Sequence, residues 1–150
     1  MARTVNERAR NTIRVLCVAV VITLGPRACS TDGRAQGMTN PALNEQAVRA
    51  ACTTKGWTKA YRPSPQWTSA RKRELLREAG LPNDAAKDYE LDHRVPLCAG
   101  GSPTDPANLW LQPWPDALRK DKVEAALCRD VCEGRMSLQE AQRRMVAWQP

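Results

Sequence analysis

The sequence predicts a single small α+β domain, in which a hairpin-like pair of strands is followed by a long helix, flanked by further helices and cross-linked by disulfides. Three observations support this fold class. A chain of 150 residues, 42% of them hydrophobic, allows one domain with a modest core. Two short apolar segments, at 89–97 and 108–112, precede a helical pattern that runs from 115 or 116 to about 132. Six cysteines are present.

The composition excludes several classes of protein. No apolar stretch reaches the roughly 18 residues of a membrane span. No repeat of about 20–50 residues indicates a solenoid or a propeller. His93 is the one histidine of the chain, so a mechanism that needs two is excluded.

The first 30 residues predict a secretory signal peptide. Four arginines precede an apolar run of 11 residues at 15–25, Pro26 ends that run, and a small-residue cleavage site follows at 28–30. A short membrane anchor is the alternative, but the run would rise only about 16 Å as a helix, half of a bilayer core. Acylation of Cys29 would give a lipoprotein, although the arginine two places earlier fits that poorly. We therefore expect a periplasmic or secreted protein that leaves the membrane after cleavage.

Removal of this segment would lower the net charge. Residues 1–30 hold five arginines and one acid, so the rest of the chain carries 18 basic and 15 acidic residues and its charge falls from +7 to +3. The high pI is therefore weak evidence for nucleic-acid binding. We expect a flexible lead-in at 31–39 and a single domain at 40–150.

The cysteines fit export. Removal of 1–30 leaves Cys52, Cys98, Cys128 and Cys132, an even number suited to an oxidising compartment. Cys128 and Cys132 lie four apart on one face of the expected helix, where a bond between them has poor geometry. Each should then pair with Cys52 or Cys98, in either order. A zinc site is the alternative, but only one pair approaches the spacing of a zinc knuckle.

Helices are expected on both sides of the strand pair. Asn40 and Pro41 predict a helix to about Thr54, and an extended connector follows at 57–66. Thr68 or Ser69 is expected to cap a second helix that ends at 80. The capping-box sequence at 137–140 predicts a last helix to 148.

One group of residues points to chemistry. Asp92 and His93 end an apolar strand, and a Gly-Gly loop at 100–101 and then Asn108 follow. A carboxylate and an amide suit a hard divalent ion, and an imidazole with a pKa near ~6.5 can take a proton from water. Neighbouring side chains of a regular strand point to opposite faces, so the two converge only if the strand bends or ends there.

These residues resemble a known family. The segments ELDHRVPL (90–97), GG (100–101) and DPANLW (105–110) look like the core of the HNH, or ββα-metal, nucleases. Residues 52–148 more narrowly resemble small secreted bacterial proteins of that type, in three pieces: Cys52–Pro63, Asp92–Trp110 and Lys120–Gln142. The resemblance covers about two-thirds of the chain, and only its central motif is specific.

The resemblance implies a treble-clef-like ββα site. His93 would be the general base, Asp92 a ligand of Mg²⁺ or Mn²⁺ (with Zn²⁺ as the alternative), and Asn108 the residue that fixes the loop. The substrate would be DNA or RNA, bound by a monomer. The resemblance also implies disulfides between Cys52 and Cys132 and between Cys98 and Cys128.

The chain departs from the family at the third metal position. The family has a His or Asn about one turn into the helix, where Ala117 and Leu118 stand here. Asp116 or Asp121 is the substitute that we expect, and Asp121 shares a helical stripe with the cysteines. A salt bridge between Asp121 and Lys120 is the alternative reading.

Substrate contacts and a second function remain open. The five tryptophans are expected to pack in the core, although one of them could stack on a base beside Arg62 or Arg94. A degenerate relative that binds without cleaving is the alternative function, because the third ligand is missing and phosphate neutralisation needs clustered cations.

Overall fold

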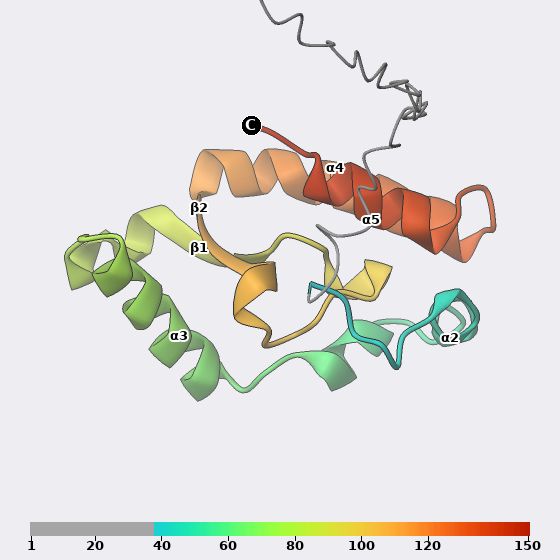
Figure 1. Cartoon of the computed structure of the whole chain (residues 1–150), viewed down its shortest axis with the longest axis horizontal. Coiled ribbons are helices and arrows are strands. Elements are labelled where there is room, and N and C mark those ends of the chain that lie inside the picture. Colours follow the sequence, from blue (N-terminus) through green and yellow to red (C-terminus); the bar gives the residue numbers. More distant parts are fainter. Residues whose placement is uncertain (1–37) are drawn as a thin grey trace, which may run out of the picture.

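The computed structural model describes residues 38–150 (Figure 1). The expected signal peptide at 1–30 and the lead-in up to 37 lie outside the described residues. The α-helices are α2 (Glu45–Ala51), α3 (Pro65–Glu78), α4 (Trp114–Cys132) and α5 (Leu138–Val146), and the strands are β1 (Tyr89–His93) and β2 (Leu109–Pro113). Short 3-10 helices are η1 (Trp57–Tyr61), η2 (Asn83–Asp88), η3 (Leu97–Ala99) and η4 (Pro106–Asn108).

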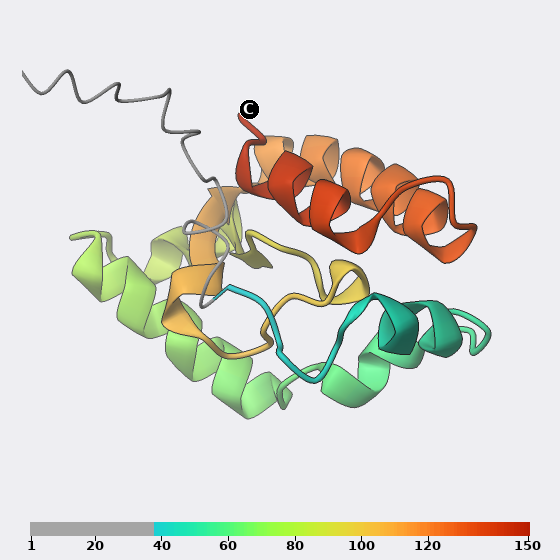
Figure 2. The same cartoon turned by 45° about the vertical axis from the view of Figure 1, so that its right-hand side comes forward.

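The expected α+β class is confirmed. β1 and β2 form a two-stranded antiparallel sheet in which Leu91 lies opposite Leu111 and His93 opposite Leu109. The long helix α4 follows β2 directly. Figures 1 and 2 show the hairpin between α3 on one side and the α4–α5 pair on the other.

Two helices begin at different residues from those expected. The side chain of Asn40 bonds to the N–H of Ala42 in a turn, while Asn44 caps α2 by accepting from Ala47 N at 2.9 Å. Ser64, rather than Thr68 or Ser69, caps α3, because Pro65 supplies a first helical residue with a preset φ.

The last helix begins where its capping sequence predicted. The hydroxyl of Ser137 accepts from Glu140 N at 3.2 Å. Only half of the capping box forms, because the Glu140 carboxylate pairs with Arg143 and Arg144.

Three loop expectations need correction. The expected connector at 57–66 contains η1 and the start of α3. β1 ends at His93, and the chain bends at 94–95 where the strand was expected to continue to 97. The end of the expected lead-in is structured, because Thr39 forms an isolated β-bridge with Gly101.

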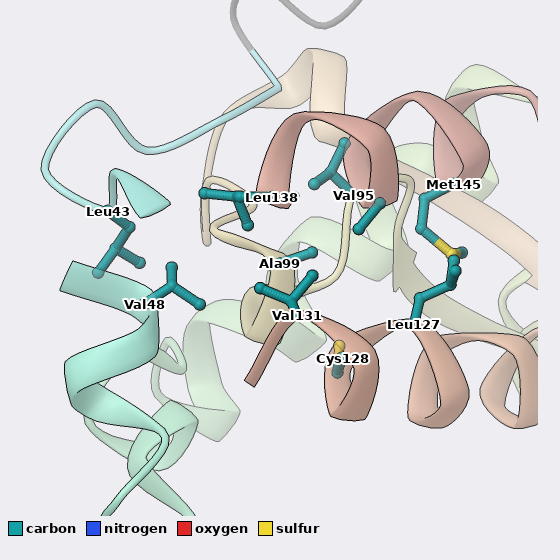
Figure 3. Close-up of a cluster of buried hydrophobic side chains, with 10 residues drawn as sticks. Leu43, Val48, Val95, Ala99, Leu127, Cys128, Val131, Leu138 and Met145 are labelled. Carbon is teal, nitrogen blue, oxygen red and sulfur yellow. The ribbon is translucent and has the colours of Figure 1, made fainter. Parts of the chain in front are cut away.

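The core lies between α2, α4, α5 and the turn after β1 (Figure 3). Its members are buried aliphatic side chains from all four segments: Leu43, Val48, Val95, Ala99, Leu127, Val131, Leu138, Ala141 and Met145. Val95 and Ala99 bring the loop between the strands into this core. The segment that follows the Asp92-His93 pair is therefore held by packing as well as by hydrogen bonds.

Both implied disulfides are present. Cys52 is bonded to Cys132 and Cys98 to Cys128, so the two cross-links end four residues apart near the C-terminus of α4. Cross-links of this kind are typical of proteins from oxidising compartments. Within residues 38–150, no helix is long and apolar enough to cross a membrane.

Candidate functional site

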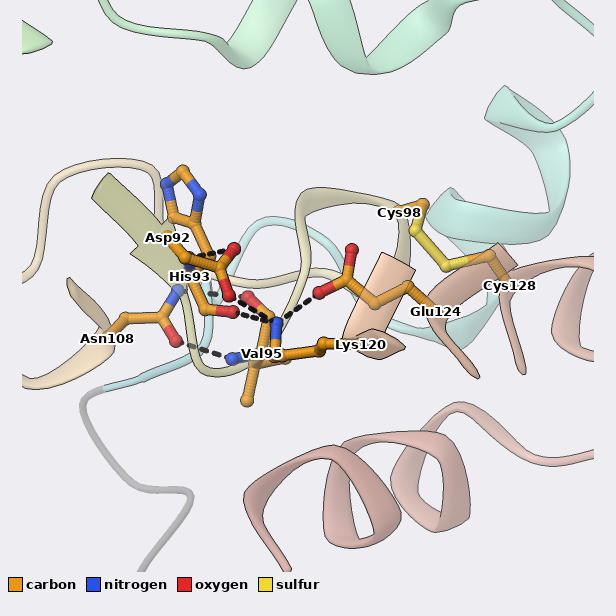
Figure 4. A network of polar contacts seen from close by, with 8 residues as sticks. All are labelled: Asp92, His93, Val95, Cys98, Asn108, Lys120, Glu124 and Cys128. Carbon is orange, nitrogen blue, oxygen red and sulfur yellow. Dashed lines mark hydrogen bonds and ion pairs between the residues drawn. A yellow bond between two sulfur atoms is a disulfide. The ribbon is translucent and has the colours of Figure 1, made fainter. Parts of the chain in front are cut away.

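A polar cleft of about 190 Å³ lies between β1, the segment around η1 and α3, and α4. Its charged and titratable lining residues are Arg62, Glu90, Asp92, His93, Asp121 and Glu124. Asp92 and His93 both line this cleft, although they are neighbours in a strand that is paired through both residues. β1 ends at His93, and the imidazole projects away from the contact between Asp92 and Lys120 (Figure 4).

His93 is held as a neutral base. Its Nε2 lies 3.1 Å from the backbone oxygen of Pro103. A carbonyl oxygen only accepts, so Nε2 carries the proton and Nδ1 keeps its lone pair. Burial lowers the pKa of His93, although the hydrogen bond to Pro103 and the charge of Asp92 oppose this effect. The imidazole is therefore neutral near pH 7.

Asn108 fixes the chain just after His93. Its fully buried amide accepts from Val95 N at 2.8 Å and donates to Val95 O at 3.0 Å and to Ser102 O at 2.8 Å. Its backbone oxygen accepts from Arg94 N at 2.8 Å. Asn108 thus holds the backbone that follows His93 through Arg94 and Val95.

The buried cation of the site is Lys120 of α4, whose side chain is 2% exposed (Figure 4). Its Nζ donates to the backbone oxygen of His93 at 2.7 Å and to Oε1 of Glu124, and it forms an ion pair with Oδ2 of Asp92 at 2.8 Å. The other carboxylate oxygen of Asp92, Oδ1, accepts from His93 N at 2.7 Å. Oδ1 of Asp92 is therefore hydrogen-bonded, whereas Oδ2 is buried, forms no hydrogen bond within residues 38–150 and has the ammonium group of Lys120 as its charge partner.

Two further carboxyl groups of the cleft, those of Glu124 and Glu90, have raised pKa values. Burial raises the pKa of Glu124 to about 7, against the opposing charge and hydrogen bond of Lys120. Burial, followed by the charges of Asp92 and Asp121, raises the pKa of Glu90. The cleft thus places a neutral imidazole and a carboxyl group that titrates near neutrality on one surface.

A divalent metal ion on Asp92 does not fit this arrangement. The carboxylate chemistry is suitable for such an ion, but Oδ2 of Asp92 already faces an ammonium group and Oδ1 a backbone N–H. Among the residues that the structure describes, no three or more His, Cys, Asp or Glu side chains gather as a metal site. The metal stays a prediction of the resemblance.

The other residues predicted for the site divide into two groups. Arg62 lines the cleft, and so does Asp121, which is exposed on α4. Arg94 is not among the lining residues, because its guanidinium stacks over the Trp110 ring at 4.8 Å from the centroid. The structure thus brings Arg62 and Asp121 together with His93 and places Arg94 elsewhere.

Sequence reasoning missed Lys120 as the central residue of this network. Lysine is almost never fully buried, and the sequence suggested only a salt bridge between Lys120 and Asp121, whereas the ion pairs of Lys120 are with Asp92 and Glu124. The sequence nevertheless contains a pattern that indicates burial of Lys120. Lys120, Glu124 and Cys128 follow one another at intervals of four and so share one helix face, and the disulfide from Cys128 to Cys98 holds that face against the rest of the domain.

Comparisons with known proteins identify no relative of this chain. A scan against protein-family models finds no match, and searches of curated proteins and of solved structures find none either.

Proposed function

We propose that this protein is an exported nuclease of the HNH type, which hydrolyses phosphodiester bonds of DNA or RNA with His93 as its general base. β1, β2 and α4 would be its ββα core. The observation that carries the proposal is the anchored imidazole: the bond from Nε2 to Pro103 O leaves Nδ1 as a lone-pair acceptor in a polar cleft.

The proposed reaction uses groups of the cleft alone. Nδ1 of His93 takes a proton from a water molecule as the water oxygen forms a bond to phosphorus. The bond from phosphorus to the leaving oxygen breaks, and that oxygen receives a proton from Glu124 or from solvent. Glu124 suits the donor role because its pKa is raised to about 7.

Arg62 supplies the positive charge that faces the substrate. It is exposed at the cleft, and a guanidinium pairs well with phosphate oxygens. Trp67 also lines the cleft and offers a ring face on which a base can stack. Both groups favour a nucleic acid over a small phosphate ester, because they provide for a phosphate and a base together.

A second candidate is a binding module of the same frame that no longer cleaves. The observation that favours it is the ion pair between Lys120 and Asp92, which occupies the expected metal ligand. Such a module would bind nucleic acid through Arg62 and Trp67 and leave it intact.

The test is cleavage by the oxidised chain 31–150 of supercoiled plasmid DNA and of single-stranded RNA, followed with time on gels. We expect the wild type to cut one of these substrates and His93→Ala to lose more than about 100-fold in rate, because general-base catalysis contributes about 10²–10⁴-fold.

Two controls separate the candidates. His93→Ala is purified identically, so equal activity in the two preparations would expose a contaminant and remove His93 from the reaction. Binding of labelled oligonucleotides without cleavage, weakened by Arg62→Ala and unchanged by His93→Ala, would establish the binding module instead.

A further inference from the structure

The environment of Lys120 is built like a cation site. Three oxygens from two elements surround its Nζ: the His93 backbone oxygen and the Asp92 carboxylate from β1, and the Glu124 carboxylate from α4. Figure 4 shows Nζ between these oxygens, while the imidazole projects away from it. The side chain is 2% exposed, so the ammonium group is a fixed part of the interior.

We infer that the ammonium group of Lys120 is a built-in cation that takes the place of a divalent metal ion on Asp92. This inference concerns the cation site alone and holds whether or not the cleft cleaves nucleic acid. Lys120 is accordingly a positioning residue, since it touches Asp92 and the His93 backbone and has no access to a substrate.

Electrostatics make the ammonium and a metal ion mutually exclusive. A metal ion binds a carboxylate oxygen at about 2.1–2.5 Å. An ion at that distance from Oδ2 of Asp92 would have Nζ, 2.8 Å from the same oxygen, as its close neighbour. Like charges so near each other in a buried place repel strongly, and moving Nζ away from such an ion would break its bond to the His93 backbone oxygen.

The same contacts give Lys120 a mechanical role at His93. It holds the carbonyl group of His93 directly, and it holds the Asp92 carboxylate whose Oδ1 accepts the N–H of His93. Both backbone groups of His93 are thus fixed by one ammonium group. A metal ion bound to the carboxylate alone would not hold the carbonyl group in this way.

The decisive experiment measures Mn²⁺ binding by electron paramagnetic resonance on the oxidised chain, without any activity assay. We expect wild type and Asp92→Asn to bind Mn²⁺ equally weakly, because Asp92 is already paired. Lys120→Met should gain a site at least about tenfold tighter. That site should disappear in the Lys120→Met/Asp92→Asn double variant. Lys122→Met, which removes an exposed lysine of the same helix, is the matched control and should gain nothing.

Two results would overturn the inference. One is wild-type Mn²⁺ binding that Asp92→Asn abolishes. The other is a Lys120→Met protein with native amide spectra that gains no site. Should Lys120→Met fail to fold, relaxation of wild-type NMR signals by Mn²⁺ decides: stronger broadening at Asp92 and His93 than at Asp130 contradicts the inference, and equal broadening supports it.

Loss of nuclease activity tests something different. A wild type that neither cuts nor binds nucleic acid refutes the proposed function and leaves the cation assignment intact. A wild type that cuts nucleic acid but binds Mn²⁺ through Asp92 refutes the cation assignment and leaves the proposed function intact.

Discussion

At the scale of single residues, the environment of His93 sets the pH dependence of the proposed reaction. A general base acts in its neutral form, and burial lowers the pKa of His93 below its ordinary value of 6.5. The rate should therefore rise with pH with a midpoint below pH 6.5. Where Glu124 donates the proton to the leaving oxygen, the rate should fall again above about pH 7, because the donor then loses its proton. A pH–rate profile of kcat/KM checks this, and a midpoint of the rise above pH 6.5 would contradict a buried base.

Glu124 should make stability depend on pH. Its pKa is about 7 in the folded protein against 4.5 in an open chain, so the folded state binds this proton more tightly. The resulting stabilisation is complete below pH 4.5 and is lost as pH rises through about 7. Its size is at most about 3 kcal/mol.

The measurement for Glu124 is urea unfolding between pH 4.5 and 8, compared with Glu124→Gln. His93 acts in the opposite sense over part of this range, since its pKa is lowered. The difference between the two proteins isolates the carboxyl group. Parallel stability curves for wild type and variant would show that Glu124 does not titrate as described.

Asn108 is expected to contribute to stability through its hydrogen bonds. Asn108→Ala leaves the buried N–H and C=O of Val95 without their partner, and each such group costs about 1–3 kcal/mol. We expect the free energy of unfolding to fall by about 2–4 kcal/mol, measured with denaturant. Asn108→Asp retains the acceptor for Val95 N and removes both donors, so it separates the two halves of the interaction.

At the scale of elements, the turn after η3 depends on a missing side chain. A Cβ at Gly101 would stand 1.9 Å from Val95 O and 3.0 Å from Asn108 Nδ2. Gly101→Ala must therefore push the backbone away from the residues that fix His93. We expect a loss of about 3 kcal/mol or more in unfolding free energy.

Gly80→Ala is the matched control for this turn. Gly80 has a φ of +68° but no atom within 4 Å of an added Cβ, so only backbone strain of about 1–2 kcal/mol opposes the change. Equal losses in the two variants, compared by thermal unfolding, would show that the close contact at Gly101 relaxes without cost.

Element types were predictable from the sequence where local signals agree, whereas boundaries were set by tertiary contacts. Ser137 begins α5 as predicted, because its cap and the apolar positions behind it coincide. Asn40 has the same capping chemistry, but its backbone N–H bonds to Gly100 O at 2.8 Å, which draws the segment into the loop and delays α2. No local pattern reports a bond across 60 residues.

The candidate site was predictable in part for a similar reason. Asp92 and His93 stand out because polar residues end an apolar strand, and the strand does end there. Lys120 does not stand out, since its burial depends on oxygens of β1 that lie far away in the sequence. Arg94 was predicted to face a phosphate, but the ring of Trp110 on the paired strand lies beneath its guanidinium.

At the scale of the whole molecule, the two disulfides should contribute unequally to stability. Cys52 and Cys132 are separated by 80 residues and Cys98 and Cys128 by 30, so the first bond restricts the unfolded chain more. The loop-entropy relation gives a stabilisation of about 4 kcal/mol for the Cys98–Cys128 bond and roughly 1 kcal/mol more for the Cys52–Cys132 bond.

Paired Cys→Ser variants test this ranking by urea unfolding without reductant. The Cys52/Cys132 variant should be the less stable of the two, and wild type with reductant should fall below both. The reverse order would indicate that the unfolded chain keeps structure around the longer loop.

The two cross-links also have a geometric consequence. A helix that is cross-linked at one residue can still tilt and can still rotate about its own axis. Helix α4 is cross-linked at two residues, through Cys128 to η3 and through Cys132 to the residue after α2, so both motions are restricted. Lys120 lies two turns before Cys128 on the same helix, so its orientation toward β1 depends on these two covalent bonds, one of which borders the cleft through Cys98. A thiol reductant should thus disturb the position of His93 by freeing α4, without any contact with the imidazole itself.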